Sequence, residues 1–325
     1  MRQLKPFAVL MAALVSAAGA GSQAQAQADY PNRPIRLIVG FPPGSSADIA
    51  ARVIGNHMTK TLGQQVVVES KPGAASSIAA AEVARAEKDG YTLFMLSAAN
   101  VINEQINPKL NFNIAKDFAP VAMVNTTAII LAVHPSVGAN DVKSLIAIAK
   151  SKPGELNYAS TGVGTVPHLA GELFAIRAGV KMLHVPYKGS QESATDLLAG
   201  RVSMIFSPAS AVIAHGQAGK LKLLATGTGV RLGVLPDLPT MVEAGVPDFE
   251  TAIWFGLVAP TGTPGPVIDK LGKAVVAATS APEAAKAWEP QGILPLKGGP
   301  ADFAKFIASE TKRWGEAASA AGLKK

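Results

Sequence analysis

The stretch of sequence that decides the fold class is residues 35–48, which read IRLIVGFPPGSSAD. The short apolar run from Ile35 to Val39 has the length and the branched side chains of a buried strand. Glycine, proline and serine follow and predict a loop, and the pattern from Ala47 to about Leu62, ended by Gly63, predicts a helix. A strand, a tight loop and a helix in this order are the repeating unit of an α/β protein.

A second segment has the same construction. Residues 156–168 read LNYASTGVGTVPH and predict a strand, a Gly/Ser/Thr loop over residues 160–165 and then a helix. The first N–H groups of a helix have no partner within it, and the helix dipole favours negative charge there, so each loop is a candidate anion site. Any α/β protein needs such turns, and one loop alone means little. One loop in each half of the chain predicts that two lobes close on one small anion.

The N-terminus has the order of a secretory signal peptide: a basic start over residues 1–5, an apolar run to about Ala20, and small residues up to Ala28. We expect a signal peptide over residues 1–26, with cleavage after Ala26 or Ala28, and therefore a periplasmic protein. The alternative is a membrane anchor, but a spanning helix needs about 20 apolar residues and this run is shorter.

Composition excludes several other classes of protein. The chain has 325 residues and no cysteine, so it has no disulfide or thiol chemistry. Its formal net charge is +7, but the lysines and arginines are scattered, whereas a nucleic-acid site needs a basic patch. The five histidines have no metal-ligand spacing. We expect no nucleic-acid partner, no metal and no cofactor.

The length and the alternation of strands and helices predict two lobes, because the exported chain exceeds one typical core. Residues 127–254 contain a complete strand–helix set of their own, and the last third of the chain is mainly helical. The predicted division is residues 29–126 with 255–325 in the first lobe and residues 127–254 in the second. The capping-box spacing of Thr240 and Glu243 predicts a short helix that ends at Gly245.

No motif indicates catalysis. Both loops lack the lysine of a P-loop, the pair Gly162 and Gly164 lacks the third glycine of a dinucleotide motif, and no G-x-S-x-G elbow is present. A Ser-His-Asp set drawn from distant residues carries no weight. We therefore expect a receptor and not an enzyme. The alternatives are a receptor that signals to a membrane sensor, and a periplasmic hydrolase of esters or amides.

Three single residues allow two interpretations each. His168 stands beside the second loop and either contacts a ligand or is structural. Asp48 would repel an anion, so we expect it to cap its own helix or bond a neighbouring loop. Trp254, where the chain should return between the lobes, is expected to pack at the hinge in preference to lining the cleft.

Over essentially the whole exported chain, the sequence resembles the Bug-type receptors, the substrate-binding proteins of tripartite tricarboxylate transporters. The resemblance is carried by residues 34–39 (PIRLIV), 41–44 (FPPG), 47–49 (ADI), 51–52 (AR), 71–74 (KPGA), 89–93 (DGYTL), 160–165 (STGVGT), 168–174 (HLAGELF), 184–189 (HVPYKG), 235–240 (LPDLPT) and 254–260 (WFGLVAP).

The resemblance implies an α/β fold of the type 2 periplasmic-binding-protein class, with two lobes, a central mainly parallel sheet in each, and two interlobe crossings. It implies a monomeric receptor that takes a small organic carboxylate to two integral-membrane transporter subunits. Residues 160–165 would hold the carboxylate, and residues 41–48 would contact it through backbone and ordered water. The expected ligand-binding residues are Phe41, Gly44, Ser45, Ser46, Ala47, Asp48, Ser97, Ser160, Thr161, Gly162, Gly164, Thr165, His168, Tyr187 and Ser207.

The chain departs from the family pattern at three places. Gly44-Ser45 stands where the family has two glycines, and Ser207 stands where Asp or Asn is common. Residues 71–79 read KPGAASSIA, so Ala75 and Ala79 replace family glycines. Because glycine tolerates positive φ where alanine does not, we expect a changed path for this loop.

Overall fold

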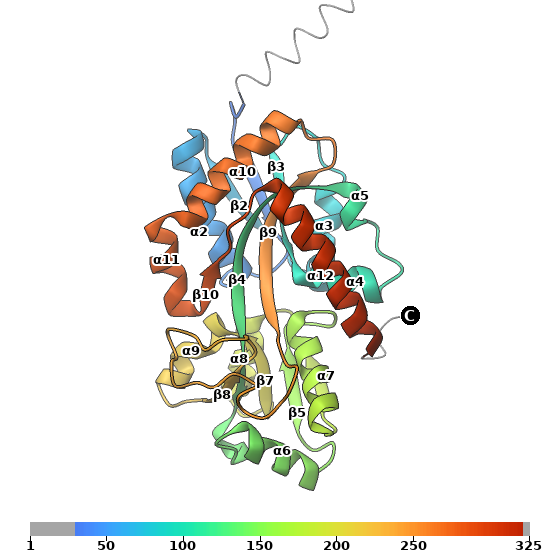
Figure 1. Cartoon of the computed structure of the whole chain (residues 1–325), viewed down its shortest axis with the longest axis vertical. Helices are drawn as coiled ribbons and strands as arrows, with labels where there is room; N and C mark the ends of the chain where they lie inside the picture. Colours follow the sequence, from blue (N-terminus) through green and yellow to red (C-terminus); the bar gives the residue numbers. More distant parts are fainter. Residues whose placement is uncertain (1–29, 321–325) are drawn as a thin grey trace, which may run out of the picture.

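Two long strands, β4 (Phe118–Val133) and β9 (Ala252–Pro260), run antiparallel and join an upper and a lower half of the molecule (Figure 1). This computed structural model describes residues 30–320, so the predicted signal peptide lies outside the described residues. The lobe boundaries proposed from the sequence fall inside these two strands, at the adjacent pairs Thr126–Trp254 and Thr127–Ile253.

The first lobe has a parallel set of three strands at one edge, and helices cover it on both faces. Its strands are β1 (Ile35–Val39), β2 (Val66–Ser70), β3 (Thr92–Ser97) and β10 (Ile293–Pro295). Its helices are α2 (Ser46–Leu62), α3 (Ser77–Val83), α4 (Ala98–Ile106), α5 (Ile114–Asp117), α10 (Gly265–Ser280), α11 (Pro282–Trp288) and α12 (Pro300–Ala320), with short 3₁₀ turns at Ala74–Ser76 and Glu289–Gln291.

The second lobe contains its own parallel set, in which β5 pairs with both β6 and β7. Its strands are β5 (Asn157–Ser160), β6 (Leu183–Pro186), β7 (Met204–Pro208) and β8 (Lys222–Thr226). Its helices are α6 (Val142–Ser151), α7 (Val166–Ala178), α8 (Ser190–Leu198) and α9 (Ala209–Gln217), with a 3₁₀ turn at Pro135–Val137.

The α/β class, the two lobes and the two crossings are confirmed. The strand order is β2-β1-β3-β9-β4-β7-β5-β6, with β10 and β8 paired to β4. The sheet is mixed, because β9 is antiparallel to β3 and to β4, and β4 is antiparallel to β7 and β8. The parallel sets at either end make one strand–helix body in each lobe, and β4 and β9 connect the two bodies.

The short helix expected from Thr240 is wrong. The capping contacts are present, since Glu243 N donates to Thr240 Oγ1 at 3.1 Å and Thr240 N donates to Glu243 Oε2 at 2.8 Å. The residues that follow form a hydrogen-bonded turn that ends at Gly245, whose φ is 92°. Gly245 N bonds Val242 O and Val246 N bonds Met241 O, so the chain leaves through a left-handed glycine after one turn.

Trp254 packs away from the space between the lobes, as expected for a hinge residue. Its indole Nε1 donates to Glu310 Oε2 at 2.6 Å, and its ring lies edge-on to Phe303 and Phe306 of α12. Trp254 is 2% exposed, so this contact fixes α12 to the middle of β9.

The loop 71–79, for which a changed path was expected, contains positive φ angles at residues with a β-carbon. Three successive non-glycine residues have left-handed backbones, Ala74 (φ 46°), Ala75 (φ 48°) and Ser76 (φ 75°). Close packing holds this turn, because a Cβ on Gly40 would lie 1.8 Å from Ser76 Oγ. Such backbones persist only where the surrounding structure over-determines them, so the turn stores strain beside the space between the lobes.

Candidate functional site

A small cavity lies between the two lobes. Residues from both lobes line it: Phe41, Pro42, Ser45, Ser46, Ser97, Ala99, Thr161, Thr165, Val166, Pro167, Gly189, Ser190, Pro208, Ile253 and Phe255. The centres of water molecules can occupy about 30 Å³ of it. By that measure one water needs roughly 10–15 Å³, so the cavity has room for about two waters or one carboxylate group.

Five helices begin at this cavity. The first turn or the N-cap of each contributes a lining residue: Ser46 of α2, Ala99 of α4, Val166 of α7, Ser190 of α8 and Pro208, the N-cap of α9. Each N-terminus brings N–H groups without helical partners and the positive end of a dipole. No charged side chain is among the lining residues, all of which lie in residues 30–320. The backbone dipoles therefore favour an anion in the cavity without any charged side chain.

Three hydroxyls in the lining add further donors. Ser46, Thr161 and Ser190 come from the start of α2, the second-lobe loop and the start of α8. Their side chains make no hydrogen bond to any residue in the range 30–320, although the three residues are at most 8% exposed. None of the three hydroxyl oxygens is fully buried, so they are open to the cavity and available to a polar group there.

The first-lobe loop is held by Asp48. Its Oδ2 accepts from Gly44 N at 3.0 Å and from Arg52 Nε at 2.9 Å, while Ser45 Oγ accepts from Asp48 N at 3.3 Å as the N-cap of α2. The carboxylate is 3% exposed and is not among the lining residues. The expectation that Asp48 bonds the neighbouring loop is confirmed, and Arg52 offsets its negative charge.

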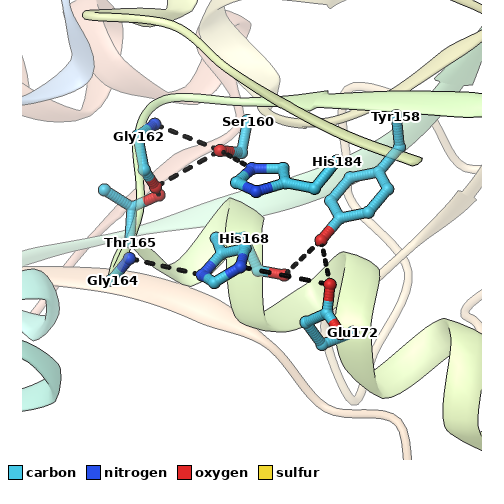
Figure 2. A network of polar contacts seen from close by, with 8 residues as sticks. All are labelled: Tyr158, Ser160, Gly162, Gly164, Thr165, His168, Glu172 and His184. Carbon is cyan, nitrogen blue, oxygen red and sulfur yellow. Dashed lines mark hydrogen bonds and ion pairs between the residues drawn. The ribbon is translucent and has the colours of Figure 1, made fainter. Parts of the chain in front are cut away.

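The second-lobe loop is held from behind by side chains of its own lobe (Figure 2). Ser160 Oγ accepts from Gly162 N at 3.1 Å, and Thr165 Oγ1 donates to Gly162 O at 2.7 Å. His168 Nδ1 accepts from Gly164 N at 3.3 Å. His168 is therefore structural in this arrangement, because it orders the loop and does not line the cavity.

The two imidazoles behind the loop, His168 and His184, stack at 4.2 Å, and Figure 2 shows them beside Tyr158. Burial, with a smaller contribution from His168, lowers the pKa of His184 to about 4, and burial also lowers the pKa of His168. Both rings are thus neutral at neutral pH, which His168 needs in order to accept from Gly164. Tyr158 Oη donates to Glu172 Oε1 at 2.5 Å and closes the network; burial raises the pKa of Tyr158.

Sequence reasoning did not find a nucleophile–base pair, but Ser160 Oγ lies 2.7 Å from His184 Nε2. Ser160 is 0% exposed, its hydroxyl is already bonded to Gly162, and it does not line the cavity. Within residues 30–320, no carboxylate lies within 4.0 Å of His184. The pair positions the loop and does not present a nucleophile to the cavity.

The structure brings six of the expected residues into the lining and places the others around it. The six are Phe41, Ser45, Ser46, Ser97, Thr161 and Thr165. The residues that support the two loops from outside the lining are Gly44, Ala47, Asp48, Ser160, Gly164 and His168. Gly162 and Tyr187 lie in a neighbouring chamber, and Ser207 is buried one position before the lining residue Pro208 and bonds Pro208 O.

The lining residues that sequence reasoning missed come mostly from contacts distant in sequence. They are Pro42, Ala99, Val166, Pro167, Gly189, Ser190, Pro208, Ile253 and Phe255. Gly189-Ser190 carried a usable signal, because it is a third strand–Gly/Ser–helix junction. Ile253 and Phe255 carried none, because they read as ordinary strand residues.

A larger outer chamber of about 650 Å³ adjoins the cavity and shares Phe41, Pro42 and Thr161 with it. The strained turn Ala74–Ser76 forms part of its wall, opposite Tyr187 and Lys188 of the second lobe. A molecule with its head group in the inner cavity could extend into this chamber.

The lobes touch at the mouth of the cavity. Gln191 Nε2 donates to Gly44 O at 3.4 Å, and a Cβ on Gly189 would lie 3.1 Å from Pro42 Cγ. On the other side, a Cβ on Gly164 would lie 2.7 Å from Asn103 Oδ1 of α4. These contacts hold the lobes in a closed arrangement around the cavity.

Residues 30–320 contain no group of three His, Asp or Glu side chains arranged to hold a metal ion. None of the helices in this range combines the length and the apolar character of a membrane span.

Two α/β lobes, two crossing strands and an anion-favouring cavity between the lobes define a solute-binding protein of the periplasmic-binding-protein class. A family model described as tripartite tricarboxylate transporter family receptor matches residues 50–323. The chain belongs to this family of receptors, as the sequence blocks predicted.

Individual relatives align with this chain along almost their whole length. Protein BugT of Bordetella pertussis is 36% identical over 310 residues, which cover 94% of this chain and 95% of BugT. A solved R. palustris protein with adipate has a TM-score of 0.87 and 33% identity, and the match covers 91% of this chain and 99% of that one. MatC from Rhodopseudomonas palustris with bound malate has a TM-score of 0.83 and 30% identity, with coverage of 89% and 99%.

Proposed function

We propose that this protein captures a small organic carboxylate in the cavity between its lobes and delivers it to a tripartite tricarboxylate-type secondary transporter. The observation that carries the proposal is the convergence of five helix N-termini on a cavity without a charged side chain. Such a site binds a carboxylate through N–H groups and hydroxyls that are already in place.

The size of the cavity favours recognition of the head group only. About 30 Å³ accommodates one carboxylate, and the rest of the acid would extend into the outer chamber of about 650 Å³. Adipate and malate, the acids solved with two of the similar proteins, have this form of a carboxylate on a short chain. The ligand-binding assignment of the fifteen residues expected from the sequence is part of the same proposal.

The proposal also covers the compartment, the partners and the moving lobes of the protein. The protein would act in the periplasm as a monomer after removal of its signal peptide, with two integral-membrane subunits as partners and without catalysis. Residues 29–126 with 255–325 and residues 127–254 would move as the two lobes. The crossings at β4 and β9 support this division, because they connect the lobe bodies directly.

Calorimetric titration of ligand-stripped protein with succinate, adipate, malate and citrate tests the proposal. We expect saturable one-to-one binding of at least one acid, and Thr161→Val to weaken that binding by about tenfold, because a hydrogen bond to a charged group is lost. Thr195→Val is the matched control, since Thr195 is an exposed residue of α8 that bonds Gln191 O. If none of the four acids binds, the proposed function is contradicted.

A further inference from the structure

Two fully buried polar side chains of β4 have no partner within the described chain. Both amide atoms of Asn125, Nδ2 and Oδ1, and the hydroxyl Oγ1 of Thr127 lack a hydrogen bond to any residue of the range 30–320. Both residues are 0% exposed. Burying a polar group without a hydrogen bond costs free energy, which an apolar side chain of the same shape would not cost. The presence of a polar side chain at both Asn125 and Thr127 therefore needs a reason.

The strand register places both side chains on the face of the sheet that carries the ligand cavity. Asn125 is directly opposite Phe255, which is itself opposite Ser97. Thr127 is directly opposite Ile253. Opposed residues of antiparallel strands point to the same face. Because Ser97, Ile253 and Phe255 line the cavity, Asn125 and Thr127 continue its floor by one strand.

Thr126, the residue between Asn125 and Thr127, has a hydroxyl with a hydrogen-bond partner. Thr126 points to the other face of β4, where its hydroxyl donates to Ile253 O at 3.1 Å. The orphan polar atoms are therefore confined to the cavity face of this strand. The next residue on that face, Ile129, is paired with Pro208, a lining residue. On the other side of β4, Asn125 and Thr127 are opposite Pro295 and Ile293 of β10, so the cavity lies on the β9 side of the orphan pair.

We propose that Asn125 and Thr127 are ligand-positioning residues, which complete the hydrogen bonding of the bound carboxylate through an ordered water between them and the cavity. The inference rests on the proposed function. An amide N–H and a hydroxyl are both donors, so the water that they hold presents its own proton to the anion.

The test uses the full exported chain and the isosteric variants Asn125→Leu and Thr127→Val. Thr127→Ser is the conservative variant, because it retains the hydroxyl. Thr126→Val is the matched control on the opposite face of the strand. Each protein is titrated with adipate and malate by calorimetry, and its thermal midpoint is measured without ligand.

We expect Asn125→Leu and Thr127→Val to bind about tenfold more weakly, with a thermal midpoint equal to or above that of the wild type. Thr127→Ser and Thr126→Val should bind as the wild type does. Unchanged affinity in both isosteric variants would overturn the inference while leaving the proposed function intact. A lowered midpoint in both variants would also overturn it, because the polar atoms would then serve the fold.

Discussion

The imidazole Nε2 of His184 on β6 lies 2.7 Å from the hydroxyl oxygen of Ser160, the last residue of β5. The same hydroxyl bonds the backbone of Gly162. A side chain from a neighbouring strand thus fixes the start of the loop that faces the ligand cavity. The loop is held in place before any ligand arrives, which reduces the entropy that binding must overcome.

Acid should weaken both the fold and ligand binding through His184. Its pKa is about 4 in the folded protein, below the ordinary value of about 6.5, so the unfolded chain takes up the proton first as the pH falls. The stability contributed by the neutral ring is complete above about pH 6.5 and is lost progressively toward pH 4.

Urea unfolding at about pH 7.5 and about pH 5 measures this effect. We expect the free energy of unfolding to fall less in His184→Gln than in the wild type between these pH values. The difference between the two proteins should be up to about 1 kcal/mol per pH unit. His57→Gln on α2, outside the second lobe, should behave like the wild type. Equal losses in His184→Gln and the wild type would show that the ring does not carry the effect.

Gly164→Val should weaken carboxylate binding strongly. Gly164 has φ 78°, and a Cβ there would lie 2.7 Å from Asn103 Oδ1 across the lobe interface, so valine adds both backbone strain and a clash that opposes closure. Gly154→Val is the matched control, because Gly154 has φ 82° and open space around it. We expect both variants to lose about 1–2 kcal/mol from backbone strain, and only Gly164→Val to lose affinity. Calorimetry with adipate or malate and thermal unfolding separate the two effects.

Asp48→Ala should reduce affinity although Asp48 does not line the cavity. The substitution removes the acceptor of Gly44 N and of Arg52, so the first-lobe loop loses its anchor and Arg52 its partner. We expect a loss of roughly 1–3 kcal/mol of stability and at least tenfold weaker binding. Asp48→Asn keeps a side-chain oxygen that can accept from Gly44 N and removes the buried negative charge, so it should affect affinity much less. Equal effects in the two variants would contradict this role of Asp48.

Replacing Ala75 by glycine should stabilise the protein. Ala75 has φ 48° and ψ 49°, a left-handed conformation that costs a non-glycine residue about 1–2 kcal/mol. Ala79→Gly is a contrasting control, since Ala79 lies inside α3, where glycine costs about 1 kcal/mol. Urea unfolding should therefore show opposite signs for two substitutions of the same kind. A destabilised Ala75→Gly would mean that the turn is not strained.

Sequence reasoning predicted the strand–loop–helix junctions well, because their signals are local. The breakers Pro42 and Gly44 and the glycine stops of the helices act within a few residues of where they stand. It could not give the conformation of Ala75, because the positive φ angles of this turn accompany close packing of the neighbouring Ser76 against Gly40, which is distant in sequence. It missed α4 because this helix follows β3 directly at Ser97, with no glycine or proline between them.

The sequence by itself determined the α/β class, the family, and two helices that begin at Gly/Ser/Thr loops, since each of these depends on residues that are close together in the chain. Only the tertiary structure decided that five helix N-termini meet at one cavity, that His184 holds Ser160, and that Asn125 and Thr127 are paired with the cavity residues Phe255 and Ile253. The physical reason is register. The pairing of β4 with β9 joins residues far apart in the chain, and a shift of one position would turn every side chain of β4 to the opposite face.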